Sequence, residues 1–281
     1  MKQHTLKKSY TFQGRGVHTG KPVTMHLCPA QADSGIVFRR DDLPGKPLVP
    51  AVLDYVDRTR RSTSLQKDGV KVHTPEHLLS ALLGLGVDNA LVCLDAAEVP
   101  ILDGSARPFA AAIVADGVEE QSVERHEIVV RRPFTFDDPQ SGSRLSFEPY
   151  DGFAIDVTID YSAKSKVIGI QEARYGASAD YARDIAPCRT FCLLKEVLPL
   201  RMLGLIRGGT LENALVARNT RGYVGHPELL FENEPARHKL LDLMGDLSLA
   251  GKPIRGRISA HKPGHRVNTQ ALKLFLSDHT L

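Results

Sequence analysis

The chain has 281 residues, and its 36 Lys and Arg exceed its 33 Asp and Glu so slightly that the formal net charge is +3. This charge gives no support to nucleic-acid binding, and no apolar run is long enough to span a bilayer. The 4 cysteines form no CxxC pair, which argues against a disulfide framework or a thiolate zinc cluster. Because no signal-peptide core follows the charged N-terminus, a reducing, cytoplasmic setting is expected.

Short strand-like runs separated by turns fill the first part of the chain, at residues 6–12, 23–27 and 36–40. The glycine-rich turn at 14–20 has neither P-loop nor dinucleotide spacing, so it is not expected to hold a phosphate. The basic run at 58–61 predicts a solvated strand or loop.

The first helix is predicted to follow Thr74 as its N-cap, with Pro75 as the first helical residue and leucines at helical spacing to Gly84 or Gly86. A compact apolar strand is predicted at 88–94, a turn at 101–105 and a small-residue helix at 108–115. In the second half the pattern predicts strands at 127–130, 143–147, 153–159 and 254–260, helices at 180–186 and 195–203, and a loop at 264–268.

The most informative helix is predicted over 234–247, where Pro235 suits a first helical position and leucines recur at helical spacing. His238 and Asp242 stand four residues apart, so both project from one face. An imidazole and a carboxylate are two ligands of a zinc site. A simple His–Asp hydrogen-bonded pair fits the same spacing, and on this stretch alone it is the favoured interpretation.

Two helices share the pattern His-x-Leu-x-x-Leu-x-Gly, one from His77 and one from His238. Each precedes a strand and follows several others. This repeat predicts an α+β fold of two related layered subdomains packed face to face, divided into residues 1–125 and 126–281. His77 and His238 would then lie near a shared cleft.

If the halves face each other, His77 becomes a third ligand beside His238 and Asp242, and a tetrahedral zinc keeps one position for water. Glu76, at the helix start, could take a proton from that water, although an acid interacting with the helix dipole is the simpler interpretation. No HExxH motif occurs, so the usual zinc peptidase helix is absent.

His265 is the remaining histidine of interest because it lies in a predicted Gly-flanked loop, where Asp246 could hold its tautomer or charge. A merely solvated histidine is the alternative. Lys239 and Lys262 could bind phosphate as point charges, although each alone would be an ordinary surface lysine.

Several motifs, taken together and in this order, carry a resemblance that covers nearly the whole chain. They are Val17-His-Thr-Gly20, Thr74-Pro-Glu-His-Leu78, Ile101-Leu-Asp-Gly-Ser105, Arg189-Thr-Phe191, Gly208-Gly-Thr210, Arg237-His-Lys-Leu-Leu-Asp242, Gly245-Asp-Leu247 and Lys262-Pro-Gly-His265. The chain resembles the UDP-3-O-acyl-N-acetylglucosamine deacetylases, zinc amidases of bacterial lipid A synthesis.

The resemblance implies zinc-dependent hydrolysis of the N-acetyl amide of UDP-3-O-(3-hydroxyacyl)-N-acetylglucosamine, releasing acetate, which is the committed step of lipid A biosynthesis. It implies one zinc per chain on His77, His238 and Asp242, and Fe²⁺ could occupy the same ligands. Glu76 would be the general base. A monomer without a nucleic-acid partner or a transmembrane segment is expected.

The remaining roles are also implied by the resemblance. His265 would be the charged acid that stabilises the oxyanion and protonates the leaving amine, oriented by Asp246, and Thr190 would donate a hydrogen bond to the oxyanion. The substrate contacts would come from Lys239 and Lys262 at the diphosphate, Phe191 at the sugar, Tyr161 at the uracil, and Leu194, Val197 and Ile206 along the acyl chain. For these last three, simple helix core is an equal alternative.

The chain departs from the family in two places. Residues 161–166 lack the usual His-Pro pair, which puts the uridine contacts in doubt, and residues 60–64 contain no cysteine, so a thiolate is not expected near the metal. Two rival functions remain: a zinc amidohydrolase of the same layout acting on another acylated amino sugar, and a non-enzymatic binding module in which His238 and Asp242 are structural.

Overall fold

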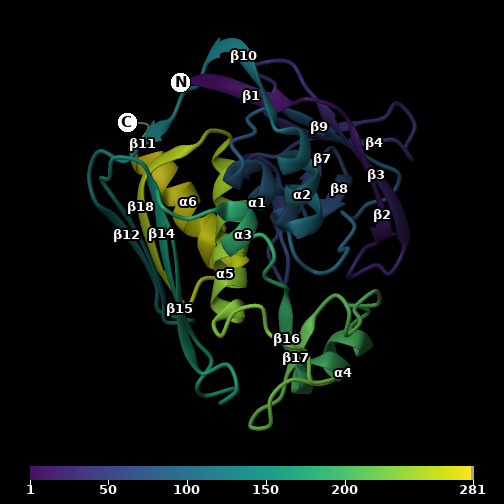
Figure 1. Cartoon of the computed structure of the whole chain (residues 1–281), viewed down its shortest axis with the longest axis vertical. Helices are drawn as coiled ribbons and strands as arrows, with labels where there is room; N and C mark the ends of the chain where they lie inside the picture. Colours follow the sequence, from purple (N-terminus) through teal and green to yellow (C-terminus); the bar gives the residue numbers. More distant parts are fainter. Residues whose placement is uncertain (280–281) are drawn as a thin grey trace.

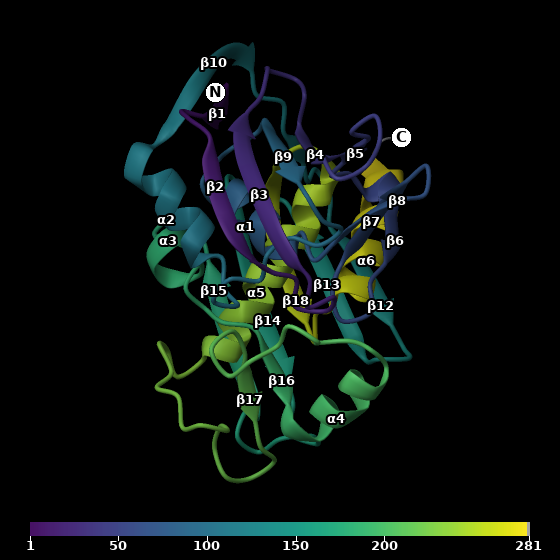
Figure 2. The ribbon, with the colours of Figure 1, turned by 90° about the vertical axis from the view of Figure 1, so that its right-hand side faces the viewer.

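The fold is a sandwich in which helices lie between two β-sheets, as seen in a computed structural model that describes residues 1–279 (Figures 1 and 2). The inner layers contain α1 (Glu76–Gly84), α2 (Arg107–Asp116), α5 (Glu234–Leu247) and α6 (His265–His279). Because helices and sheets are segregated into layers, the chain has the α+β fold that was predicted.

The first sheet has the strand order β2-β3-β9-β4-β5. Its strands are β2 (Tyr10–Arg15), β3 (Pro22–Pro29), β9 (Ala90–Leu94), β4 (Ile36–Arg40) and β5 (Leu48–Pro50). All neighbours are antiparallel except β4 and β9, which run parallel.

The second sheet repeats this topology with the order β12-β13-β18-β14-β15. Its strands are β12 (Phe134–Asp138), β13 (Ser143–Glu148), β18 (Ile254–His261), β14 (Phe153–Asp160) and β15 (Ile170–Tyr175), and the short β11 (Ile128–Val129) also pairs with β18. Here β14 and β18 are the parallel pair. In the first half α1 precedes β9 and α2 follows it, and in the second half α5 precedes β18 and α6 follows it. The two halves are therefore related layered subdomains, as predicted.

Each half also carries an insert. The first is a three-stranded sheet of β6 (Val56–Arg58), β7 (Ser64–Lys67) and β8 (Val70–His73), preceded by η1 (Leu53–Tyr55). The second contains α3 (Tyr181–Asp184), β16 (Phe191–Leu193), α4 (Leu194–Met202) and β17 (Leu215–Ala217). A ribbon of β1 (Lys2–Leu6) and β10 (Val118–Glu124) closes the first half, and η2 (Ser248–Ala250) extends α5.

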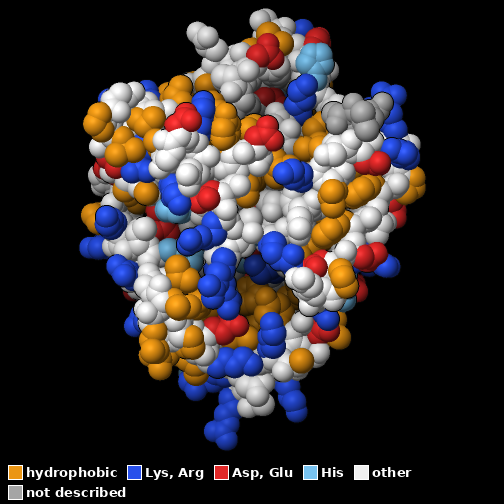
Figure 3. Space-filling model, turned by 180° about the vertical axis from the view of Figure 1, so that it is seen from behind, with side chains coloured by type: hydrophobic (Ala, Val, Ile, Leu, Met, Phe, Trp, Pro, Cys, Tyr) orange, Lys and Arg blue, Asp and Glu red, His pale blue; other side chains and the backbone are white. Residues whose placement is uncertain are grey.

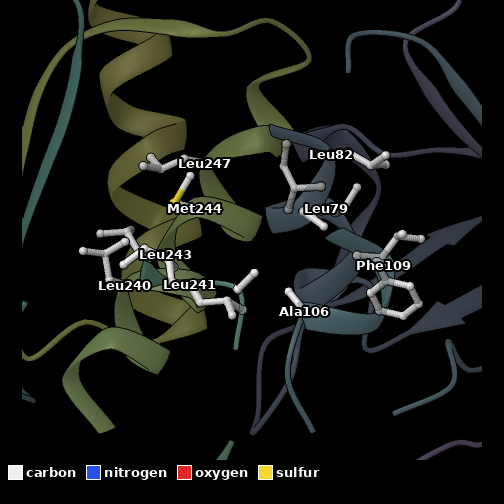
Figure 4. Close-up of a cluster of buried hydrophobic side chains, with 14 of the residues drawn as sticks. Leu79, Leu82, Ala106, Phe109, Leu240, Leu241, Leu243, Met244 and Leu247 are labelled. Carbon is white, nitrogen blue, oxygen red and sulfur yellow. The ribbon is translucent and has the colours of Figure 1, made fainter. Parts of the chain in front are cut away.

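A large part of the core lies between α1 and α5, with α2 packed against α1 (Figure 4). Leu79 and Leu82 of α1 are each only 1% exposed, and Leu241 and Met244 of α5 are fully buried. Burying apolar side chains from helices far apart in sequence holds the two halves face to face. The helices that carry the candidate ligands are therefore fixed by packing rather than by local propensity.

Several local predictions were wrong. The strand expected at 6–12 is interrupted, because β1 ends at Leu6 and β2 begins at Tyr10. Thr74 does not cap α1: it has a φ of 56°, and its hydroxyl donates to Glu98 instead. The predicted loop at 264–268 is the first turn of α6, because the Asn268 amide N–H donates to the Gly264 carbonyl at 2.8 Å and the Asn268 side chain accepts from the Gly264 amide. Within the described residues, no helix combines the length and the apolar character needed to cross a membrane.

Candidate metal centre and catalytic cleft

Three buried side chains from the two halves converge at the contact between α1 and α5. His77 is the second residue of α1, and His238 and Asp242 lie one turn apart on α5. The Nε2 atoms of His77 and His238 lie 3.6 and 3.4 Å from Oδ1 of Asp242. One ligand atom from each residue lies within 4.8 Å of the others, a spacing that would let a single ion touch all three.

Gly245 allows the two helices to come this close. A Cβ at this position would overlap the carbonyl oxygen of Glu76 and would lie only 2.8 Å from its carbonyl carbon and 2.9 Å from its Cα. Only glycine therefore fits where α5 crosses the start of α1. The same contact places Glu76 and His77 against the face that carries His238 and Asp242.

The protonation states of His238 and Asp242 suit metal binding. Burial lowers the pKa of His238 to about 3, although the nearby Asp242 works in the opposite direction. Its Nδ1 lies 3.0 Å from the Cys188 carbonyl oxygen, which accepts the ring N–H and leaves the Nε2 lone pair for a cation. Burial also acts to raise the pKa of Asp242, but Lys239 and His238 outweigh it and hold that pKa well below its usual value. Neutral imidazoles and an ionised carboxylate are the forms that ligate metals.

Glu76 and His265 lie on the next side of the cleft. Oε1 of Glu76 is 3.8 Å from Nε2 of His265, and the other carboxylate oxygen accepts from the Thr63 amide at 3.3 Å. Burial raises the pKa of Glu76 to about 7 despite the opposing charge of His265. Burial alone would lower the pKa of His265, but Asp246 overcomes it and raises the pKa to about 9. A carboxyl group with a pKa near neutrality thus faces an imidazole whose pKa lies above it.

Asp246 fixes the orientation of His265. One oxygen of Asp246 accepts from Nδ1 of His265 at 2.9 Å and from Asn268 at 2.8 Å, and the other accepts from the Thr63 hydroxyl at 2.6 Å. The imidazole ring therefore turns Nε2 toward Glu76. Thr63 and Asn268 were not identified from the sequence, where a lone threonine or asparagine carries no distinguishing pattern.

An apolar cavity of about 230 Å³ opens beside this cleft. Glu76, His77 and Thr190 line it together with the apolar side chains Phe191, Leu194, Val197 and Ile206. His18 and Arg61, which were not predicted as site residues, line it as well. Arg61 also donates to Glu196 at 2.9 Å, so the predicted solvated run at 58–61 ends in a residue of the cavity wall.

The predicted substrate-binding cations already have acidic partners, and Lys239 lies beside the metal trio. Lys239 donates to Asp242 at 2.5 Å and stands 5.6 Å from the Phe191 ring centroid. Lys262 pairs with Asp160 at 3.1 Å. The rings of Tyr161 and Phe191 pack edge to face, with centroids 5.4 Å apart.

Glu98 is a buried carboxylate that no motif in the sequence indicated. It accepts from the amides of His18 and Thr19 at 2.8 Å each, and from the hydroxyls of Thr19 at 2.6 Å and Thr74 at 3.0 Å. It thereby ties the 16–20 turn to Thr74, two residues before the start of α1. An acid among the apolar residues Val99 and Ile101 was the only available signal.

Comparison with known proteins finds one family that matches nearly the whole chain. Residues 3–277 match the family described as "LpxC: UDP-3-O-acyl N-acetylglycosamine deacetylase". The chain is 43% identical to the UDP-3-O-acyl-N-acetylglucosamine deacetylase of Myxococcus xanthus, with 98% of this chain and 87% of the relative covered. It is 41% identical to the deacetylase of the same name in Acidithiobacillus ferrooxidans, with 98% and 90% covered.

A further relative is longer than this chain. The bifunctional enzyme LpxC/FabZ of Porphyromonas gingivalis is 42% identical over 98% of this chain, but the match covers only 64% of that relative's length. The chain thus spans about two thirds of the bifunctional relatives that it matches.

Proposed function

Because this chain belongs to the UDP-3-O-acyl N-acetylglycosamine deacetylase family, we propose that it hydrolyses the N-acetyl amide of UDP-3-O-(3-hydroxyacyl)-N-acetylglucosamine in lipid A biosynthesis. The observation that carries this proposal is the convergence of His77, His238 and Asp242 beside Glu76, with Glu76 and His77 also lining an apolar cavity. An amidase for a lipid-bearing sugar needs both features.

His77, His238 and Asp242 would hold the divalent cation, one per chain, and their nitrogen and oxygen donors fit zinc, with Fe²⁺ as the alternative. When bound, the ion would polarise the amide carbonyl and lower the pKa of the attacking water. The remaining chemistry belongs to side chains of this protein.

Glu76 would take a proton from the water as the water oxygen attacks the acetyl carbon. A pKa near 7 suits a base that works close to neutral pH. His265, kept protonated by Asp246, would stabilise the developing oxyanion and then give its Nε2 proton to the amine as the carbon–nitrogen bond breaks. Thr190, which lines the same cavity, would donate to the oxyanion.

The substrate would extend in two directions from the cleft. Its acyl chain would enter the cavity along Leu194, Val197 and Ile206. The UDP-sugar would lie toward Lys239, Lys262, Phe191 and Tyr161. The two cations already contact Asp242 and Asp160, so they would exchange part of those contacts for the diphosphate.

We also propose that residues 1–125 and 126–281 form the two subdomains, and that the protein is cytoplasmic and monomeric. This division is supported by the two sheets, since β2 to β9 precede residue 125 and β11 to β18 follow it.

The test is a deacetylation assay on the UDP-linked acyl sugar with a metal count on the same sample. We expect Glu76→Ala to keep the fold and the metal but to lose turnover by roughly 10²–10⁴-fold. Glu120→Ala, an exposed acid on β10, is the matched control and should behave as wild type. Turnover retained by Glu76→Ala would remove Glu76 as the base, and activity only on another acylated amino sugar would change the proposed substrate.

A further inference from the structure

The helix α4 exposes an apolar stripe on its outer side. Leu194, Leu198 and Met202 follow one another at intervals of four residues and are 43%, 68% and 80% exposed. This spacing places them on one face of the helix. Val197 and Leu200 line the apolar cavity beside the cleft, and Leu194 also reaches that cavity from the start of the helix. The helix is therefore apolar on both sides, although only its inner side is covered by protein.

A cationic hollow of about 370 Å³ adjoins the start of this stripe. It is lined by Leu194 and by four cations, Lys164, Lys195, Arg218 and Arg221. Within residues 1–279, no Asp or Glu lines the hollow, and none of the four cations pairs with a carboxylate. The one acid of α4, Glu196, is paired with Arg61 on the cavity side.

The stripe and the hollow together form the α4 surface, which lies at one end of the molecule, beyond the two sheets (Figure 1). Seen from behind, that end displays Lys and Arg side chains around apolar ones (Figure 3). Leu203 and Leu211, 60% and 53% exposed, follow α4 in the chain. Exposed leucines are unfavourable in water, and unpaired cations attract anions. The stripe and the hollow together therefore fit a partner that is both apolar and anionic.

We propose that the α4 surface docks onto an anionic phospholipid bilayer. The stripe would enter the boundary between headgroups and acyl chains, while the four cations would lie at the level of the lipid phosphates. The charge pattern selects this partner, because an apolar stripe alone would fit any apolar surface. Docking would also bring Leu194, which lines both the hollow and the apolar cavity, to the membrane surface.

The proposal is tested by co-sedimentation of the full chain with vesicles of phosphatidylcholine alone or mixed with phosphatidylglycerol. We expect binding to the mixed vesicles only, and weaker binding as salt is raised. Arg218→Gln combined with Arg221→Gln should weaken binding roughly thirtyfold, from about fivefold for each cation near an anionic surface. Leu198→Ser combined with Met202→Ser should also weaken it, because the stripe no longer enters the lipid.

The matched control is Arg144→Gln combined with Arg257→Gln, which removes the same charge from cations that pair with Asp137 and Asp156 on the second sheet. This control should bind vesicles as wild type does. Equal binding to neutral vesicles, equal loss in the control, or a change of oligomeric state in the Leu198 and Met202 variant would overturn the proposal; the last outcome would assign the stripe to a second copy of the chain. Since vesicle binding is measured without turnover, its failure leaves the proposed deacetylase activity intact, and the reverse also holds.

Discussion

Gly245→Ala tests whether close contact between α1 and α5 assembles the metal centre. The new methyl group would lie 2.8 Å from the carbonyl carbon of Glu76, where ordinary contact begins at 3.4 Å. The start of α1 must therefore move by at least roughly 0.6 Å, because the carbonyl oxygen of Glu76 lies closer still, and His77 is the next residue. Metal–ligand distances tolerate only about 0.2 Å. We expect metal affinity to fall roughly 10–100-fold, the range found when the support of a ligand is disturbed.

The same substitution should reduce stability modestly. Overpacking a core costs about 1–3 kcal/mol, while alanine in place of glycine inside a helix returns about 1 kcal/mol. A net loss of up to about 2 kcal/mol would lower the melting temperature of the metal-free protein by at most several degrees.

The assay is a zinc titration with thermal unfolding of the metal-free and metal-loaded protein. Gly176→Ala is the matched control, because a Cβ there meets only Ala154 at an ordinary 3.8 Å. Wild-type zinc affinity in Gly245→Ala would refute the idea that this contact sets the ligand geometry.

The other predictions concern the metal, Glu98 and Glu234. Removing the ion with a chelator should abolish deacetylation and added zinc should restore it, whereas activity that persists in metal-free protein would contradict any metal mechanism. Glu98→Gln should cost about 1–3 kcal/mol in urea unfolding, because a side-chain amide would face backbone N–H groups that need an acceptor. It should also raise KM more than it lowers kcat, because Glu98 holds the turn whose His18 lines the cavity. Unchanged steady-state kinetics would count against a role of Glu98 in positioning that turn. Glu234→Ala should cost roughly 3 kcal/mol in the same unfolding assay, because the fully buried carboxylate accepts from Arg189 and from the Leu230 amide; a loss below about 1 kcal/mol would show that water replaces those contacts.

The local pattern of the sequence was enough to predict both central helices and the relation between the two halves. Apolar residues at helical spacing identify α1 and α5 because burial of one face is a local property of an amphipathic helix. The repeated His-x-Leu-x-x-Leu-x-Gly pattern predicted the paired subdomains that the two sheets display. The spacing of His238 and Asp242 likewise placed two candidate ligands on one face.

Only the tertiary structure decided which residues surround those ligands. Thr63 donates to Asp246, which lies 183 positions away in the sequence. Glu98 accepts from Thr74 and also from His18 and Thr19, which precede it by 80 and 79 residues. Such partners follow no local period, because their contacts arise when separate elements pack and every buried polar group must find a donor or acceptor. The start of α6 at His265 was missed for a related reason: Pro263 and Gly264 are typical of a loop, and hydrogen bonds between Gly264 and Asn268 close the first turn. Spacing along the chain thus determined the helix faces, and packing between the halves determined the cleft that they enclose.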